Sequence, residues 1–273
     1  METLSGSNDP LQNGYQFKFN QYLNRGWELF KSQALLHIGT LVVFLIISVI
    51  AGFILGLIPG IGSILANILN AILFAGYFIA ADKIAQGKEP EFKDFFGGFN
   101  FFGPMALYQI VYMLIMFLAL LLPIIYLLWV VIPFEEIIQL AQYEDELKAF
   151  LTDYFKGGEF AENLTSIIIP VILILIISIY VGLIYTITAP LIVLKKYSFW
   201  QAMETSRKVV NKKFFSFFLF LILLGLINFA GVILLGIGLL VTVPFSILAI
   251  YAIYEDLYGG ESNPADELDV HVQ

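Results

Sequence analysis

Four long stretches of this chain contain no charged residue, and they decide what it can fold into. They cover residues 32–81, 95–134, 163–194 and 214–254, which is more than half of the 273 residues. Only 13% of the chain is charged and 59% is hydrophobic, whereas soluble domains average about 25% charged residues. So little polar surface cannot cover a soluble core of that size. The composition excludes a soluble enzyme, a disordered chain and a nucleic-acid binder, and it predicts a polytopic membrane protein.

The lengths of these stretches predict the number of spans, because a helix that crosses about 30 Å of hydrocarbon needs roughly 20 residues. The first and last stretches are long enough for two helices each, with turns at Pro59-Gly60 and Gly236-Ile237-Gly238. The other two hold one each, and we expect 163–194 to be one long helix bent at Pro170 and Pro190. The six expected spans are about 36–58, 63–81, 104–128, 164–194, 214–235 and 239–257.

The distribution of basic residues predicts how the spans are oriented. Six spans place the N-terminal segment and the loops 82–102 and 195–213 on one side, together with twelve of the 14 lysines and arginines. The other side receives Lys148 and Lys156, within a segment that has eight acidic residues from Glu135 to Glu162. By the positive-inside rule, the basic side is cytoplasmic. The sequence therefore predicts that both termini lie in the cytoplasm.

We accordingly expect an all-α fold, a polytopic membrane helix bundle with about six transmembrane helices and additional interfacial amphipathic helices. Residues 1–258 are expected to form a single membrane domain, and 259–273 an acidic, disordered cytoplasmic tail. An outer amphipathic segment is predicted over 134–160, where it would cap the bundle or dock another protein.

Three cytoplasmic segments also show amphipathic spacing. The first lies before the first span, and the second lies in the loop 82–102. The third is a helix that Ser198 and Gln201 open with a capping box. The apolar face of the first segment consists of Phe19, Tyr22, Leu23, Trp27 and Phe30. Such helices are expected in the headgroup plane, as elbows between spans or as faces that recognise lipid or a partner. The candidate basic interfacial face consists of Arg207, Lys208, Lys212 and Lys213.

The interiors of the expected spans contain no ionisable residue, the usual marker of an ion pathway. Asp82, Lys195, Glu255 and Asp256 border them on the cytoplasmic side. The candidate polar residues within the membrane are Asn67, Asn70, Gln109, Thr188 and Asn228. They would form hydrogen bonds between helices or line a polar binding site. Gly52 and Gly56 are spaced for close helix approach. The chain has no cysteine and two histidines, so we expect no metal site and no cofactor.

Several motifs are similar to those of a known group of proteins. Ala189-Pro190-Leu191, the run Ser198 to Met203, Ser206-Arg207-Lys208 and Gly236-Ile237-Gly238 resemble a family of uncharacterised six-span bacterial integral membrane proteins. That family is similar to the membrane domain of some glycerophosphodiester phosphodiesterases, and some relatives are labelled beta-carotene monooxygenase. The resemblance implies the architecture and a bacterial cytoplasmic membrane. We carry over neither enzymatic activity, because the chain lacks a catalytic barrel and a set of histidines.

The sequence therefore favours a non-enzymatic scaffold or accessory protein. Its expected partners are the lipid bilayer and other membrane proteins, and no nucleic acid. The alternative is a passive or partner-energised transporter of a lipid-like or apolar small molecule, with a pathway lined by Asn67, Asn70, Gln109 and Thr188.

Overall fold

The computed structural model describes residues 10–156 and 164–259, and within these ranges every regular element is helical. Six helices are long and apolar enough to cross a membrane, which confirms the predicted all-α fold with six candidate spans. Their bounds are Ala34–Gly56, Gly62–Ala85, Phe92–Val131, Ser166–Val193, Phe214–Ile233 and Leu239–Tyr258. The predicted tail, apart from Gly259, and the end of the segment 134–160 lie outside the described residues.

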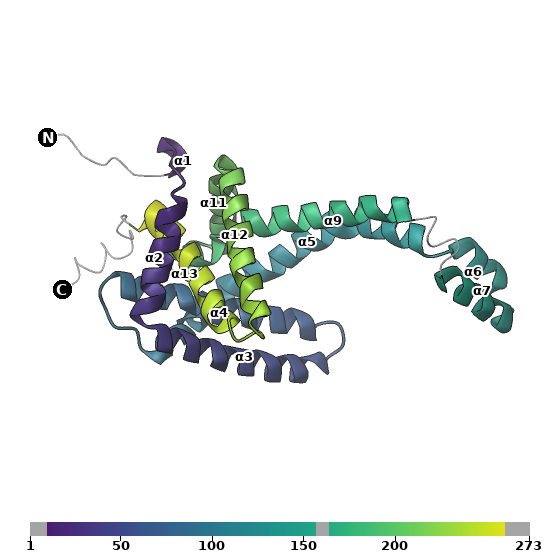
Figure 1. Ribbon diagram of the computed structural model, residues 1–273, viewed down its shortest axis with the longest axis horizontal. Helices are drawn as coiled ribbons and strands as arrows, with labels where there is room; N and C mark the ends of the chain where they lie inside the picture. The colour runs from purple at the N-terminus through teal and green to yellow at the C-terminus, as the bar shows by residue number, and fades with distance from the viewer. Residues whose placement is uncertain (1–9, 157–163, 260–273) are drawn as a thin grey trace. The chain divides into compact units, whose positions relative to one another are not determined.

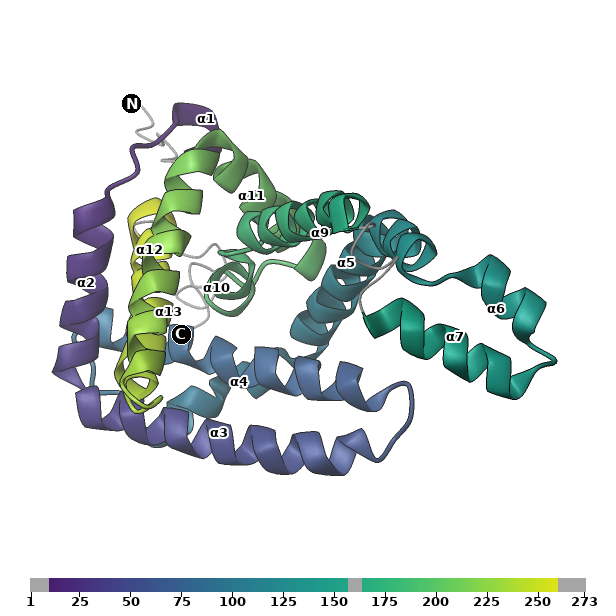
Figure 2. The same cartoon turned by 45° about the vertical axis from the view of Figure 1, so that its right-hand side comes forward.

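The helices form two compact units (Figures 1 and 2). The first consists of residues up to Val111 together with those from Leu183 onward, and the second of Tyr112–Gly182. In the first unit lie α1 (Pro10–Asn13), α2 (Phe19–Ser32), α3 (Ala34–Gly56), α4 (Gly62–Ala85), the 3₁₀ helix η1 (Phe92–Phe101), α10 (Thr188–Val193), α11 (Phe199–Lys212), α12 (Phe214–Ile233) and α13 (Leu239–Tyr258). The second unit contains α6 (Phe134–Leu140) and α7 (Glu144–Lys156), with most of α5 (Phe102–Val131) and α9 (Leu164–Ile184).

The core of the first unit is aromatic and is built around α4. Tyr77 of α4 lies edge-on to Phe44 of α3 and to Phe95 of η1, with ring centroids 5.7 and 5.0 Å apart. Edge-to-face pairs of this kind add about 0.5–1.5 kcal/mol each to the burial of the rings. Residues Leu41, Leu73 and Ala80 complete this buried cluster, against which α13 packs through Leu240, Val243 and Ile247.

Glycines permit two very close approaches between elements. A Cβ atom on Gly76 would overlap the carbonyl oxygen of Phe95, which is where η1 lies against α4. On Gly26 of α2, a Cβ atom would lie 2.7 Å from the backbone nitrogen of Ala249 of α13. On Gly52 and Gly56 of α3, the pair predicted to allow close packing, a Cβ atom would meet none of the described atoms of other elements within 4 Å.

The helix α2 packs along α13 with a face that matches the expected one only in part. Its buried residues are Tyr22, Gly26, Leu29 and Phe30, whereas Trp27, assigned to the apolar face by its spacing, is 42% exposed. Gly26 explains the difference, because the side without a Cβ atom admits the α13 backbone. The amphipathic helix is therefore held by protein contacts along its length (Figure 1).

The fourth span is broken rather than bent. The helix α9 runs through Pro170 and ends at Ile184, and a new helix, α10, begins at Thr188. Pro190 has no N–H to donate to the preceding turn, but it fits the first turn of a helix, where amide groups lack intrahelical acceptors. The break thus precedes Pro190 by a few residues. The predicted start of α11 is confirmed, since Ser198 Oγ accepts a hydrogen bond from the Gln201 amide (3.3 Å), which is one of the two bonds of the predicted capping box.

We predict that Gly76→Ala lowers the stability of the protein by about 1–3 kcal/mol, because the new methyl group must push the η1 backbone away from α4. Gly52→Ala is the matched control, since its methyl group meets no atom within 4 Å and gains helix propensity. Thermal unfolding in a mild detergent measures both variants. Equal unfolding temperatures for the two would contradict the close approach at Gly76.

Candidate functional site

Charged residues near the end of the last span meet residues of the N-terminal segment at one end of the first unit. Lys18, Tyr22 and Arg25 on or beside α2 meet Glu255 and Asp256 near the end of α13, and we call these five residues the α2–α13 seam. The sequence placed the two carboxylates at the edge of a span and the two cations in a separate segment. The fold brings together groups more than 200 positions apart.

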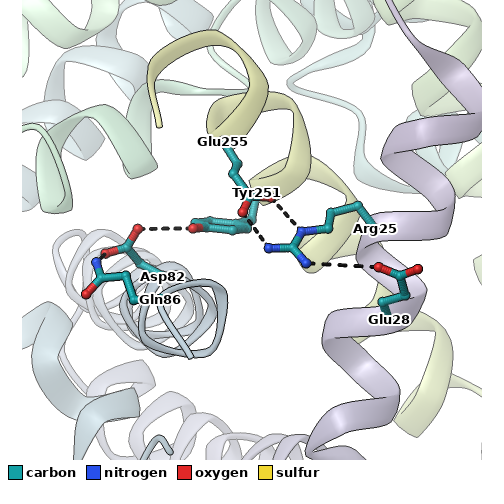
Figure 3. A network of polar contacts seen from close by, with 6 residues as sticks. All are labelled: Arg25, Glu28, Asp82, Gln86, Tyr251 and Glu255. Atoms are coloured by element: carbon teal, nitrogen blue, oxygen red, sulfur yellow. Dashed lines mark hydrogen bonds and ion pairs between the residues drawn. The ribbon is translucent and has the colours of Figure 1, made fainter. Parts of the chain in front are cut away.

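Arg25 and Glu255 form a bidentate ion pair at the centre of the seam (Figure 3). Arg25 donates from Nε to Glu255 Oε2 (2.8 Å) and from Nη2 to Glu255 Oε1 (2.6 Å). Glu28, one turn along α2, lies at 4.0 Å from the guanidinium. The hydrogen bond to Glu255 raises the pKa of Arg25 above its usual value. Paired planar groups of this kind fix geometry as well as charge.

Asp256 completes the seam by accepting two hydrogen bonds. Lys18 Nζ donates to Oδ1 (2.6 Å) and the hydroxyl of Tyr22 donates to Oδ2 (2.8 Å). Burial, together with the hydrogen bond to Asp256, raises the pKa of Tyr22 above its usual range, so the hydroxyl stays protonated and continues to donate.

Two further polar contacts tie α4 to its neighbours. The buried Tyr251 of α13 donates its hydroxyl to Asp82 Oδ1 (3.0 Å), and Gln86 donates to the other oxygen of Asp82 (2.7 Å). Figure 3 shows Tyr251 extending from α13 toward Asp82, on the side away from Arg25. Lys83 pairs with the buried Asp94 of η1 (2.7 Å). The acidic residues at the span ends are therefore engaged in ionic and hydrogen-bonded contacts between helices.

A polar hollow of about 630 Å³ opens beside the seam. Its lining includes Gln21, Asn24 and Glu28 of α2 as well as the seam residues Arg25 and Glu255. The lining combines side-chain amides, a guanidinium group and carboxylates, so the arrangement suits ion pairing and hydrogen bonding. Among the described residues, no group of three histidine, cysteine or acidic side chains is placed to hold a metal ion.

The predicted basic face lies on α11 and on the residue that follows it. Its four cations have different contacts. Arg207 donates to Glu204 from Nε (2.9 Å) and from Nη2 (2.8 Å), and Lys208 Nζ lies 3.2 Å from the same carboxylate. Lys212 donates to the carbonyl oxygen of Leu11. Lys213, at the start of α12, is exposed. These four residues thus do share one region, but Glu204 neutralises part of it.

The five predicted polar residues of the membrane interior are dispersed over four helices, α4, α5, α10 and α12. Asn67 donates to the Ser63 carbonyl of its own helix. Asn70 accepts from Ser48 of α3 (2.5 Å), and Asn228 donates to Ser246 of α13 (2.9 Å). Thr188 is buried, and its hydroxyl has no hydrogen-bond partner among the residues that the structure describes. Gln109 lies half-buried on α5.

No family model, curated protein or solved structure matches this chain. The site is therefore interpreted from its geometry alone.

Sequence reasoning missed the seam because opposite charges at distant positions carry no sign of which of them pair. Two signals were present. Glu255 and Asp256 directly follow the uncharged stretch 214–254, which places them together at the end of the last span. Arg25 comes seven positions after Lys18, a spacing that puts both cations on one helical face. Neither signal says that these two groups meet, because that depends on the packing of α2 against α13.

We predict that Arg25→Gln and Glu255→Gln each lower stability by about 1–3 kcal/mol, since each leaves a half-buried charge without its partner. The reversed pair, Arg25→Glu with Glu255→Arg, should recover part of the loss. Thermal unfolding of the singles and the double measures the coupling.

Lys93→Gln is the control, because Lys93 pairs with Glu91 (2.9 Å) where both side chains are largely exposed. It should leave the unfolding temperature unchanged. A seam substitution no more harmful than this control, with no recovery in the reversed pair, would contradict the structural role of the seam.

Proposed function

We propose that this multi-pass protein resides in the cytoplasmic membrane of a bacterium with both termini in the cytoplasm. The six candidate spans and the concentration of basic residues in alternate connections support this orientation. It places the α2–α13 seam and α11 at the cytoplasmic surface, where anionic headgroups are available to cations.

In this membrane, the protein acts as a non-enzymatic scaffold or accessory factor that binds lipid or other membrane proteins. The observation that carries this proposal is that α11 packs against the protein with its apolar face and leaves the opposite face exposed. Its apolar face, with Ala202, Met203 and Val209, is buried, and Ser206 donates to the Ile184 carbonyl at the end of α9 (2.8 Å). The opposite face presents Lys208 to solvent, and Trp200 is 62% exposed.

A basic helix fixed by its apolar face is suited to binding anionic lipid or an acidic partner surface. Lysine and tryptophan are the side chains that anchor proteins at a membrane interface. Glu204 moderates the charge, because its hydrogen bond with Arg207 lowers the pKa of the carboxyl to about 2 and keeps it ionised at any physiological pH. Glu204 therefore offsets one positive charge of the pair Arg207 and Lys208, and Lys213 adds an exposed cation.

The transporter alternative receives less support. It requires polar groups that converge on one path, whereas Asn67 bonds within its own helix and Asn70 and Asn228 bond to serines of neighbouring helices. Hydrogen bonds of this kind contribute about 0.6–2 kcal/mol each to helix association. The resemblance to the glycerophosphodiester phosphodiesterase membrane domain remains a prediction about architecture, and we propose no catalytic role from it.

We predict that Lys208→Glu combined with Lys213→Glu reduces the anionic lipid retained by the purified protein at least about fivefold. Native mass spectrometry of protein extracted in mild detergent, with phosphatidylglycerol and phosphatidylethanolamine supplied equally, measures the retention. Glu204→Gln should act in the opposite direction, because it releases Arg207 and Lys208 from their shared carboxylate.

The matched control reverses two exposed lysines of α7, Lys148→Glu with Lys156→Glu, and makes the same change in net charge. It should leave lipid retention unaltered. Equal losses from the α11 and α7 variants, or no change from either, would count against α11 as the binding face. Recovery of a membrane protein in stoichiometric amount with the unaltered chain, lost in the α11 variant, would support the partner-binding form.

A further inference from the structure

A small hollow with aromatic walls lies in the second unit, at the corner between α5 and α6. It has a volume of about 220 Å³, and Trp129, Phe134, Tyr154, Glu135 and Glu136 contribute to its lining. All of these residues belong to Tyr112–Gly182, so the hollow is formed within one compact unit. The volume falls below the roughly 300–1,000 Å³ of sites that hold drug-sized ligands, and it suits a small chemical group.

The backbone explains why these side chains converge. After α5 ends, the amide of Phe134 donates to the Ile132 carbonyl (2.8 Å), and Pro133 accepts from the Ile137 amide as α6 begins (3.0 Å). This tight turn sets Glu135 and Glu136 beside the end of α5. Tyr154 of α7 contributes from the second helix of the pair and is only 6% exposed, so it gives the hollow a fixed wall.

The chemistry of this lining favours a cation. The faces of aromatic rings carry negative electrostatic potential, and tryptophan binds cations best among them. Two carboxylates add full negative charge, and residues 134–156 contain six acidic residues against two lysines. Aromatic walls combined with carboxylates recognise organic ammonium groups, because such groups offer both charge and apolar surface.

We propose that this hollow binds an alkylammonium group. Trp129 lies two residues before the end of a candidate span and is 69% exposed, so the site is near the membrane–water boundary. The ammonium can therefore belong to the headgroup of a phospholipid or to a free amine in solution. The proposal is independent of the scaffold function, because the hollow shares no residue with α11 or with the α2–α13 seam.

The test uses Trp129 as its own reporter. The chain has three tryptophans, so the double substitution Trp27→Phe with Trp200→Phe leaves Trp129 alone. We expect choline chloride to change its fluorescence saturably in phosphatidylglycerol nanodiscs, while sodium chloride at equal ionic strength does not. Glu135→Gln with Glu136→Gln should weaken the choline midpoint about tenfold.

The matched control is Glu144→Gln with Glu146→Gln, which removes two carboxylates of α7 that do not line the hollow. It should leave the midpoint unchanged. Thermal unfolding of every variant establishes that the fold is retained. No saturable response to choline, or an equal loss of binding in both pairs of glutamate variants, would overturn the proposal.

Nanodiscs of phosphatidylethanolamine distinguish the two sources of the ammonium group. If a lipid headgroup fills the hollow, choline should need a higher concentration there than in phosphatidylglycerol. If a free amine is the ligand, the choline midpoint should be the same in both lipids. Either result supports an ammonium site and assigns its source.

Discussion

The bilayer as solvent is the constraint on which the rest of this structure depends. Because the hydrocarbon core offers no water to a charge, uncharged stretches must form the spans and ionisable groups must collect at their ends. Asp82, Glu255 and Asp256 illustrate the consequence, since each lies near the end of a candidate span and each accepts hydrogen bonds from another helix. Because charged residues are excluded from the spans and collect at their ends, they lie close enough there to form electrostatic contacts between helices.

The same constraint explains why both glycines and polar groups contribute to helix packing, the glycines by allowing close approach and the polar groups by hydrogen bonding. Within the membrane, hydrophobic association is weak, and helices associate through close contact and interhelical hydrogen bonds. Gly26 and Gly76 provide very close backbone approaches, and Asn70 and Asn228 provide bonds to serines on adjacent helices. The seam between α2 and α13 adds charge pairing at the end where Gly26 already fixes the distance between the two helices.

Features that depend on composition and local spacing could be predicted from the sequence. The uncharged stretches predicted the six candidate spans, and the spacing of Ser198 and Gln201 predicted the start of α11. Features that depend on which helix neighbours which could not. The partner of Arg25, the face by which α2 packs and the role of Gly76 all require the tertiary arrangement. Gly52 and Gly56 had favourable spacing, but a Cβ atom on either would meet no described atom of another helix within 4 Å.

The most direct test of this account is the side of the membrane on which its charged elements lie. The chain has no cysteine, so a single cysteine at Lys88, Glu146 or Lys208, all exposed, reports its own location to a membrane-impermeant maleimide. In spheroplasts, we expect labelling of Glu146→Cys alone, with Lys88→Cys and Lys208→Cys labelled only after the membrane is permeabilised. Labelling of Lys208→Cys or Lys88→Cys in intact spheroplasts would contradict the six-span arrangement with its basic face in the cytoplasm.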